Sequence, residues 1–176
     1  MKRMLLWLPL AGFALLFAVV ASGLFRPSDH LVRSQMVGKP LPTFSLPAMV
    51  PEAPGLASAT FADGKPRLLN VFASWCIPCM AESPQLMALK QQGVEIDAVA
   101  VRDTPENIEA FLKRFGNPYA RIGDDRQSAV QLALGSSGVP ETYVIDGKGR
   151  IVAQHIGDVR AEDVADLVAA VRKAGG

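Results

Sequence analysis

Cys76 and Cys79 are the only cysteines of the chain, and two residues separate them in the segment Trp75-Cys76-Ile77-Pro78-Cys79. At this spacing, the thiolate of one cysteine can attack a disulfide bond of a partner protein, and the other cysteine can resolve the mixed disulfide that results. The pair is therefore the candidate active site, and the chemistry that it predicts is thiol–disulfide exchange.

Two other roles are open to such a pair, a structural disulfide and half of a zinc site. Zinc requires further ligands, but the chain has no second cysteine pair, and its two histidines, His30 and His155, are isolated. A disulfide between such closely spaced cysteines closes a very small loop and constrains little of the unfolded chain. Redox chemistry explains the pair better, and we expect no metal and no cofactor beyond a redox-active disulfide between Cys76 and Cys79.

The residues around the pair predict the order strand, cysteine, helix. Residues 67–73 are a short apolar run, typical of a buried strand, that leads directly towards Cys76. Pro78 suits the first turn of a helix, where a missing N–H group costs nothing, and Pro84 is expected to kink that helix. A helix that begins near Cys76 would leave this sulfur exposed at its N-terminus, where unpaired backbone N–H groups and the helix dipole stabilise a thiolate. The sulfur of Cys79 would face inward.

Residues 41–176 have the length and the apolar content of one soluble α/β domain, and the polar residues 26–40 are predicted to be a linker. The remaining expected elements are a short strand near residues 59–61, a strand over 96–101, a helix over 105–115 capped by Thr104, a short helix over 128–134, a hairpin of strands 142–145 and 151–155, and a closing helix with Val164, Leu167, Val168 and Val171 on one face.

The first 25 residues predict a membrane segment. Residues 4–25 carry no charge, whereas Lys2, Arg3 and Arg26 flank them. As a helix this run would span about 33 Å, enough to cross the hydrocarbon core of a bilayer. A transmembrane helix and a signal peptide both fit, because residues 19–21 are similar to a weak cleavage site, but the length of the run favours an anchor. The short N-terminal tail then places the C-terminal domain outside the cytoplasm.

The charge of the chain is close to balanced. A formal net charge of +1 argues against a surface that binds nucleic acid, and no glycine-rich phosphate-binding motif is present. We therefore expect no nucleic-acid partner.

Beyond the cysteine pair, the chain resembles the thioredoxin superfamily. Pro84 falls where thioredoxins carry a helix-kinking proline, and residues 138–142 (Gly-Val-Pro-Glu-Thr) precede a strand as the cis-proline loop of the family does. The resemblance implies a thioredoxin-like α/β fold, in which helices flank a central mixed β-sheet, and a cis peptide bond before Pro140. The substrate-binding residues that it implies are Trp75, Val139, Pro140 and Glu141.

Within this superfamily, the likeness is to the membrane-anchored cytochrome c maturation thioredoxins, called CcmG or DsbE. It runs from about Val37 to the C-terminus, and its most specific element is the Pro-Glu-Thr that begins at the cis-proline position. The chain departs from the family at residues 132–137, where aromatic residues are common, and at residues 101–103, which read Val-Arg-Asp instead of Tyr-Lys-Asp. The segments that carry the likeness are residues 69–76, Glu82, residues 117–119, residues 138–142 and residues 145–147.

Two carboxylates near the thiols are candidates for tuning them. Asn70 stands where thioredoxin has its buried aspartate, so that proton acceptor is absent. Glu82 lies one helical turn past Cys79, and from this position alone it is either a proton acceptor for Cys79 or a solvated carboxylate. The family carries a glutamate here, which favours a catalytic Glu82 that is partly buried and has a raised pKa. Glu141 could tune the thiols, contact substrate or face water.

The resemblance implies a thiol:disulfide oxidoreductase that is tethered to the inner membrane, faces the periplasm and acts as a reductant. Cys76 would attack the oxidised Cys-x-x-Cys-His segment of apocytochrome c, or a partner that holds it, and Cys79 would resolve the mixed disulfide. Electrons would come from a membrane thiol carrier of the DsbD or CcdA type, because the periplasm has no reducing thiol pool.

Other functions remain open at this point. An oxidant of the DsbA kind would carry a large helical insertion, for which the 60 residues between Cys79 and Pro140 leave little room. A peroxiredoxin would have Thr-x-x-Cys, whereas Ala73 stands where that threonine should be. A non-catalytic module that binds apocytochrome or haem would not need two thiols, and a general periplasmic disulfide reductase of the same fold also fits.

Overall fold

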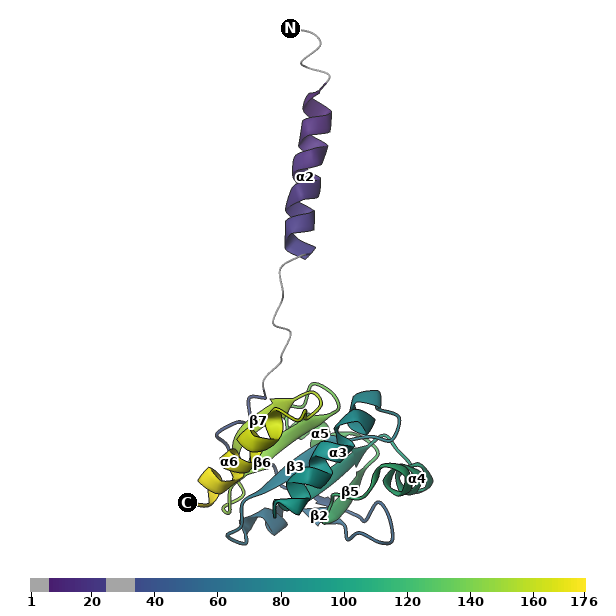
Figure 1. Cartoon of the computed structure of the whole chain (residues 1–176), viewed down its shortest axis with the longest axis vertical. Coiled ribbons are helices and arrows are strands. Elements are labelled where there is room, and N and C mark those ends of the chain that lie inside the picture. The colour runs from purple at the N-terminus through teal and green to yellow at the C-terminus, as the bar shows by residue number, and fades with distance from the viewer. Residues whose placement is uncertain (1–6, 25–33) are drawn as a thin grey trace. The chain divides into compact units, whose positions relative to one another are not determined.

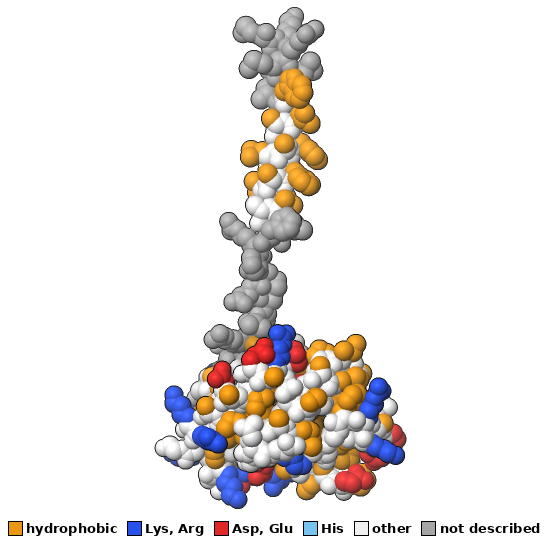
Figure 2. All heavy atoms as spheres, viewed as in Figure 1, with side chains coloured by type: hydrophobic (Ala, Val, Ile, Leu, Met, Phe, Trp, Pro, Cys, Tyr) orange, Lys and Arg blue, Asp and Glu red, His pale blue; other side chains and the backbone are white. Residues whose placement is uncertain are grey.

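The computed structural model describes residues 7–24 and 34–176, and the chain divides into two compact units, residues 1–31 and residues 32–176. The first unit holds α2 (Leu8–Leu24), a helix of 17 residues whose described side chains are largely apolar (Figure 2). In the described part of the chain, no helix is long and apolar enough to cross a membrane. Residues 4–6 and 25 of the expected membrane segment, and residues 26–33 of the expected linker, lie outside the described residues.

The second unit is built on a five-stranded mixed sheet in the order β5-β4-β3-β6-β7. The central strand β3 (Arg67–Phe72) pairs in parallel with β4 (Ile96–Val101) and antiparallel with β6 (Glu141–Ile145). Every residue of these three strands is buried, because the sheet is covered on both faces. The outer strands are β5 (Arg121–Asp125) and β7 (Ile151–Ile156).

Three helices cover one face of this sheet. The helix α3 (Ile77–Gln91) connects β3 to β4, and α4 (Pro105–Phe115) connects β4 to β5 in the same direction, so right-handed crossovers place both on the same face. The helix α3 contacts both α4 and the closing helix α6 (Asp163–Gly175), and Figure 1 shows the three in front of the sheet. The short helix α5 (Ala129–Ala133) packs against β4 and β5.

The segments that carry the expected site lie at the carboxyl ends of the parallel strands. The parallel strands β3 and β4 end there, at Phe72 and Val101, and the antiparallel strand β6 begins there, because Val71 pairs with Glu141. The active-site cysteines, the loop after β4 and the loop before β6 therefore meet at the carboxyl ends of the parallel strands, as is general in α/β sheets.

Most of the expected elements are confirmed, and one is wrong. The hairpin of β6 and β7 forms as predicted, and the Thr104 hydroxyl caps α4 by accepting a hydrogen bond from the N–H group of Asn107 (3.4 Å). The strand expected near residues 59–61 is instead the 3-10 helix η1 (Ser58–Ala62), which follows a short strand pair, β1 (Ser45–Leu46) and β2 (Leu56–Ala57). The strand was predicted from the apolar Phe61, which is fully buried. A 3-10 helix can bury this side chain as well as a strand can.

The residues before β1 pack against the domain. Residues 34–40 belong to the expected linker, yet the Ser34 hydroxyl donates a hydrogen bond to the Leu134 carbonyl, and Pro40 forms an isolated bridge with Arg150. The N–H group of Gly38 donates to the carbonyl of Ile151 at the start of β7 (2.8 Å). Residues 34–40 therefore pack against the domain.

Candidate active site

A disulfide bond joins Cys76 and Cys79, whose Cα atoms lie 5.2 Å apart. Cys76 is the N-cap of α3, and its sulfur accepts a hydrogen bond from the backbone N–H group of Cys79 (3.1 Å). In the reduced protein, an N–H group at this place and the positive end of the helix dipole would stabilise a Cys76 thiolate. The expectation of an exposed first sulfur is wrong for the oxidised protein, because both cysteines belong to the buried core, with 4% and 2% of their surfaces exposed.

The turn between β3 and the cysteines is fixed by Asp103, which follows the end of β4. Its buried carboxylate accepts hydrogen bonds from the N–H group and the hydroxyl of Ser74 (2.6 and 3.0 Å) and from the N–H group of Thr104 (2.9 Å). Sequence reasoning did not identify Asp103 as a site residue. The signal was available, because a polar residue directly after one parallel strand lies beside the end of the neighbouring strand.

Two of the expected substrate-binding residues, Trp75 and Val139, line the same groove, and Pro140 follows Val139 in the chain. Trp75 is 55% exposed, and its indole N–H group donates to the backbone carbonyl of Arg102 (3.2 Å). The Val139–Pro140 peptide bond is cis, as the family resemblance implied. A groove of about 360 Å³ runs between Trp75 and Val139, and its other lining residues are Val101, Arg102, Gln131, Leu132, Ser136, Ser137 and Gly138.

Glu141 does not face water. Its carboxylate is buried and accepts hydrogen bonds from the hydroxyl and the N–H group of Ser137 (2.7 and 2.8 Å), from the Tyr143 hydroxyl (2.7 Å) and from the Gln154 amide (2.9 Å). Burial, followed by this bond to Glu141, raises the pKa of Tyr143. Glu141 therefore ties the cis-proline loop to β6 and β7, and its carboxylate is not presented to a substrate.

Glu82 is fully buried within α3, deeper than the partial burial that the sequence led us to expect. Its Oε1 atom accepts a hydrogen bond from the Asn70 amide (3.1 Å), and its Oε2 atom accepts one from the N–H group of Val159 (3.0 Å). Burial raises the pKa of Glu82 to about 7, against the opposing effect of these two hydrogen bonds. A carboxyl group with this pKa changes its charge near neutral pH, which is where a proton acceptor for a thiol is useful.

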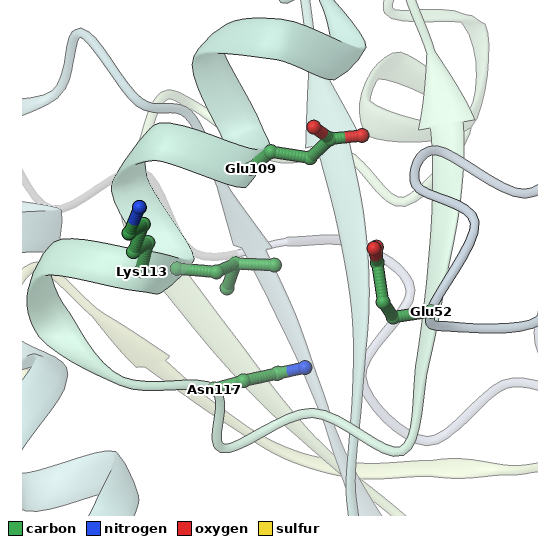
Figure 3. Close-up of a pocket in the computed structure, with 5 residues that line it drawn as sticks. Glu52, Glu109, Lys113 and Asn117 are labelled. Atoms are coloured by element: carbon green, nitrogen blue, oxygen red, sulfur yellow. The ribbon is translucent and has the colours of Figure 1, made fainter.

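A second hollow, also of about 360 Å³, lies between α4 and the loop that carries Glu52 (Figure 3). Glu109 and Lys113 reach it from α4, and Asn117 reaches it from the segment after that helix. Its polar side chains are all exposed or partly exposed, and none of its lining residues belongs to the site predicted from the sequence. This hollow therefore adds no residue to the candidate site around the cysteine pair.

A redox-active disulfide at the N-terminus of a helix, preceded by a central strand and followed by a cis-proline loop, defines a thiol:disulfide oxidoreductase of thioredoxin-like fold. The Redoxin family model matches residues 36–171. The chain is 40% identical over 170 residues to the thiol:disulfide interchange protein HelX of Rhodobacter capsulatus. The match covers 93% of this chain and 92% of HelX. It is 36% identical over 163 residues to the thiol:disulfide interchange protein DsbE of Escherichia coli K12. This match covers 90% of this chain and 88% of DsbE.

The chain therefore belongs to the DsbE/HelX family of thiol:disulfide interchange proteins. The fold agrees with this assignment. A thiol:disulfide interchange protein of the thioredoxin family from Chlorobium tepidum superimposes with a TM-score of 0.63 at 24% identity, and the match covers 82% of this chain and all of that one.

Proposed function

We propose that this protein reduces the disulfide in the Cys-x-x-Cys-His segment of apocytochrome c during cytochrome c biogenesis. Membership of the DsbE/HelX family and the residues shared with the cytochrome c maturation thioredoxins support this role. The observation that carries the proposal is the open groove between Trp75, which directly precedes Cys76, and Val139, which precedes the cis-proline, because a groove in this place can receive an extended polypeptide.

The reaction begins with the reduced protein. The Cys76 thiolate attacks one sulfur of the substrate disulfide, forms a mixed disulfide with it and releases the other substrate sulfur as a thiolate. Cys79 then gives up its proton and attacks the Cys76 sulfur, which releases the second substrate thiol and forms the Cys76–Cys79 disulfide. Two electrons pass to the substrate, and a membrane thiol carrier of the DsbD or CcdA type returns two electrons to the pair.

Glu82 is the proposed acceptor for the Cys79 proton. It lies one turn further along α3, it is buried, and its pKa of about 7 leaves it partly ionised at neutral pH. Trp75 and Val139 contact the substrate backbone and side chains on the two sides of the groove, and Glu141 supports the cis-proline loop from below.

We also propose that the N-terminal segment anchors the protein in the inner membrane, with the domain in the periplasm. The uncharged run of residues 4–25 and its basic flanks support this location. It agrees with the chemistry, because a reductant in an oxidising compartment has to be recharged by a donor that resides in the membrane.

The test compares two oxidised substrates with the reduced full-length protein. One is apocytochrome c with its Cys-x-x-Cys-His disulfide, and the other is an unrelated secreted protein with a solvent-exposed disulfide. We expect reduction of apocytochrome c to be at least tenfold faster in kcat/KM. Equal rates would indicate a general periplasmic disulfide reductase, and reduction that survives the Cys76→Ser substitution would contradict the catalytic role altogether.

A further inference from the structure

The Asn70 side chain connects Glu82 to two other segments, through Thr142 in β6 and Tyr119 before β5. It is fully buried in β3, and every hydrogen-bonding group of its side chain is used. The amide nitrogen donates to Oε1 of Glu82 (3.1 Å) and to the Thr142 hydroxyl (3.0 Å), and the amide oxygen accepts from the Tyr119 hydroxyl (2.9 Å). The charge state of Glu82 is therefore coupled to the orientation of one amide group.

Tyr119 determines this orientation. The two ends of an asparagine amide have nearly the same shape, so only hydrogen-bond partners decide which end faces which neighbour. The Tyr119 hydroxyl requires an acceptor, and it is held in place because its ring packs on Phe72 with centroids 4.8 Å apart and its N–H group donates to the Asn117 side chain (3.0 Å). Burial raises the pKa of Tyr119 well above its ordinary value, so the hydroxyl remains a donor.

We propose that Tyr119 is a positioning residue for the resolving step, because its hydroxyl holds the Asn70 amide nitrogen against Glu82 and so keeps Glu82 available as the carboxylate that accepts the Cys79 proton. This inference rests on the proposed role of Glu82. It adds to that role a residue whose hydroxyl bonds to Asn70 rather than to Glu82 itself.

Among the described contacts, the Asn70 amide is the only side-chain donor of a hydrogen bond to Glu82. The N–H group of Val159, in the loop before α6, donates to Oε2, whereas the neighbouring Asp158 carboxylate raises the pKa of Glu82 by repulsion. Without the Tyr119 hydroxyl, the Asn70 oxygen either stays buried without a donor or turns towards Oε1 of Glu82. Both arrangements weaken support for the ionised carboxylate, so Glu82 should ionise at a higher pH.

The experiment follows both thiols separately in the reduced full-length protein. One equivalent of the aromatic disulfide DTNB releases one chromophoric thiolate when Cys76 attacks and a second when Cys79 resolves the mixed disulfide. Stopped-flow traces between pH 5.5 and 8.5 give the pH midpoint of the second release. Tyr119→Phe is expected to raise this midpoint by about half to one pH unit, which slows resolution about three- to tenfold below the midpoint.

Three further variants make the result specific. Asn70→Ala removes the amide donor and should raise the midpoint at least as much as Tyr119→Phe. Tyr143→Phe removes the hydroxyl of the other buried tyrosine, which bonds to Glu141 and not to Asn70, and its midpoint should equal that of the wild type. Glu82→Gln should abolish the titration that the other variants shift, and circular dichroism checks that each variant is folded.

The outcomes separate the two proposals. A wild-type midpoint in Tyr119→Phe, or an equal shift in Tyr143→Phe, overturns the role of Tyr119. An unchanged profile in Glu82→Gln overturns the proton-accepting role of Glu82, on which the role of Tyr119 rests. If resolution of DTNB behaves as expected but apocytochrome c is not preferred as a substrate, the proposed function fails and the positioning role stands.

Discussion

Replacement of Glu82 by glutamine should change how the stability of the oxidised protein depends on pH. The pKa of Glu82 is about 7 in the folded protein, compared with an ordinary value of 4.5. Because the folded-state pKa is the higher one, the folded protein holds a proton between these pH values that the unfolded chain has lost. This contribution to stability is fully present below pH 4.5 and is lost as the pH rises through 7. The difference in pKa corresponds to about 3 kcal/mol.

Glutamine keeps the size of the side chain but does not ionise. It also has only one acceptor atom, whereas the Asn70 amide and the Val159 N–H group both donate to Glu82, so we expect a cost of about 1–3 kcal/mol at low pH. The variant should therefore be less stable than the wild type at pH 5, and this deficit should shrink or reverse by pH 8 as the wild type comes to hold a buried charge.

Urea unfolding of the oxidised full-length protein in non-ionic detergent, measured from pH 5 to pH 8, tests this expectation. Glu109→Gln, on the exposed surface of α4, is the control and should show no comparable change. A difference in free energy of unfolding between wild type and Glu82→Gln that stays constant across this range would refute the assigned pKa and its origin in burial.

Two further substitutions and one fractionation experiment test the turn before the cysteines, substrate binding and the membrane anchor. Asp103→Asn leaves one of the Ser74 and Thr104 donors without its acceptor, so it should lower the free energy of unfolding by about 1–3 kcal/mol, as urea titration measures, and equal stability would show that the turn does not depend on Asp103. Trp75→Ala should raise KM for a polypeptide disulfide more than for DTNB, and an equal effect on both would argue against a substrate-binding role. In carbonate extraction followed by N-terminal sequencing, the full-length protein should remain with the membrane, and a soluble mature form that begins near Ser22 would contradict the anchor.

Features that depend only on neighbouring residues could be predicted from the sequence. The spacing of Cys76 and Cys79, the apolar run of β3 and the position of Pro78 together predict a strand that leads to a cysteine pair at a helix start, and the structure has this arrangement. The cap at Thr104 likewise depends only on neighbouring residues. The cis bond before Pro140 followed from family resemblance and not from the residues alone.

Contacts between distant segments could not be predicted in this way. Asn70 meets Thr142 only because β3 and β6 pair antiparallel in one register, and Tyr119 reaches Asn70 from a segment before β5, a strand whose charged sequence gave no clear pattern. In the same register Glu141 pairs with Val71, and Glu141 is buried. The sequence alone did not decide whether Glu141 tunes the thiols, contacts substrate or faces water. The exposure expected for Cys76 failed for a related reason, since burial depends on the whole fold.

The central proposal is that Cys76 attacks, Cys79 resolves and the substrate is apocytochrome c. Cys79→Ser removes the resolving thiol and leaves Cys76 able to attack, so covalent complexes should accumulate on Cys76 in cells, whereas Cys76→Ser should trap far less. Mass spectrometry of the trapped complexes should identify apocytochrome c, or a maturation protein that holds it, together with the membrane thiol donor. A broad set of unrelated periplasmic proteins, with normal holocytochrome c in a strain that lacks this protein, would contradict the account.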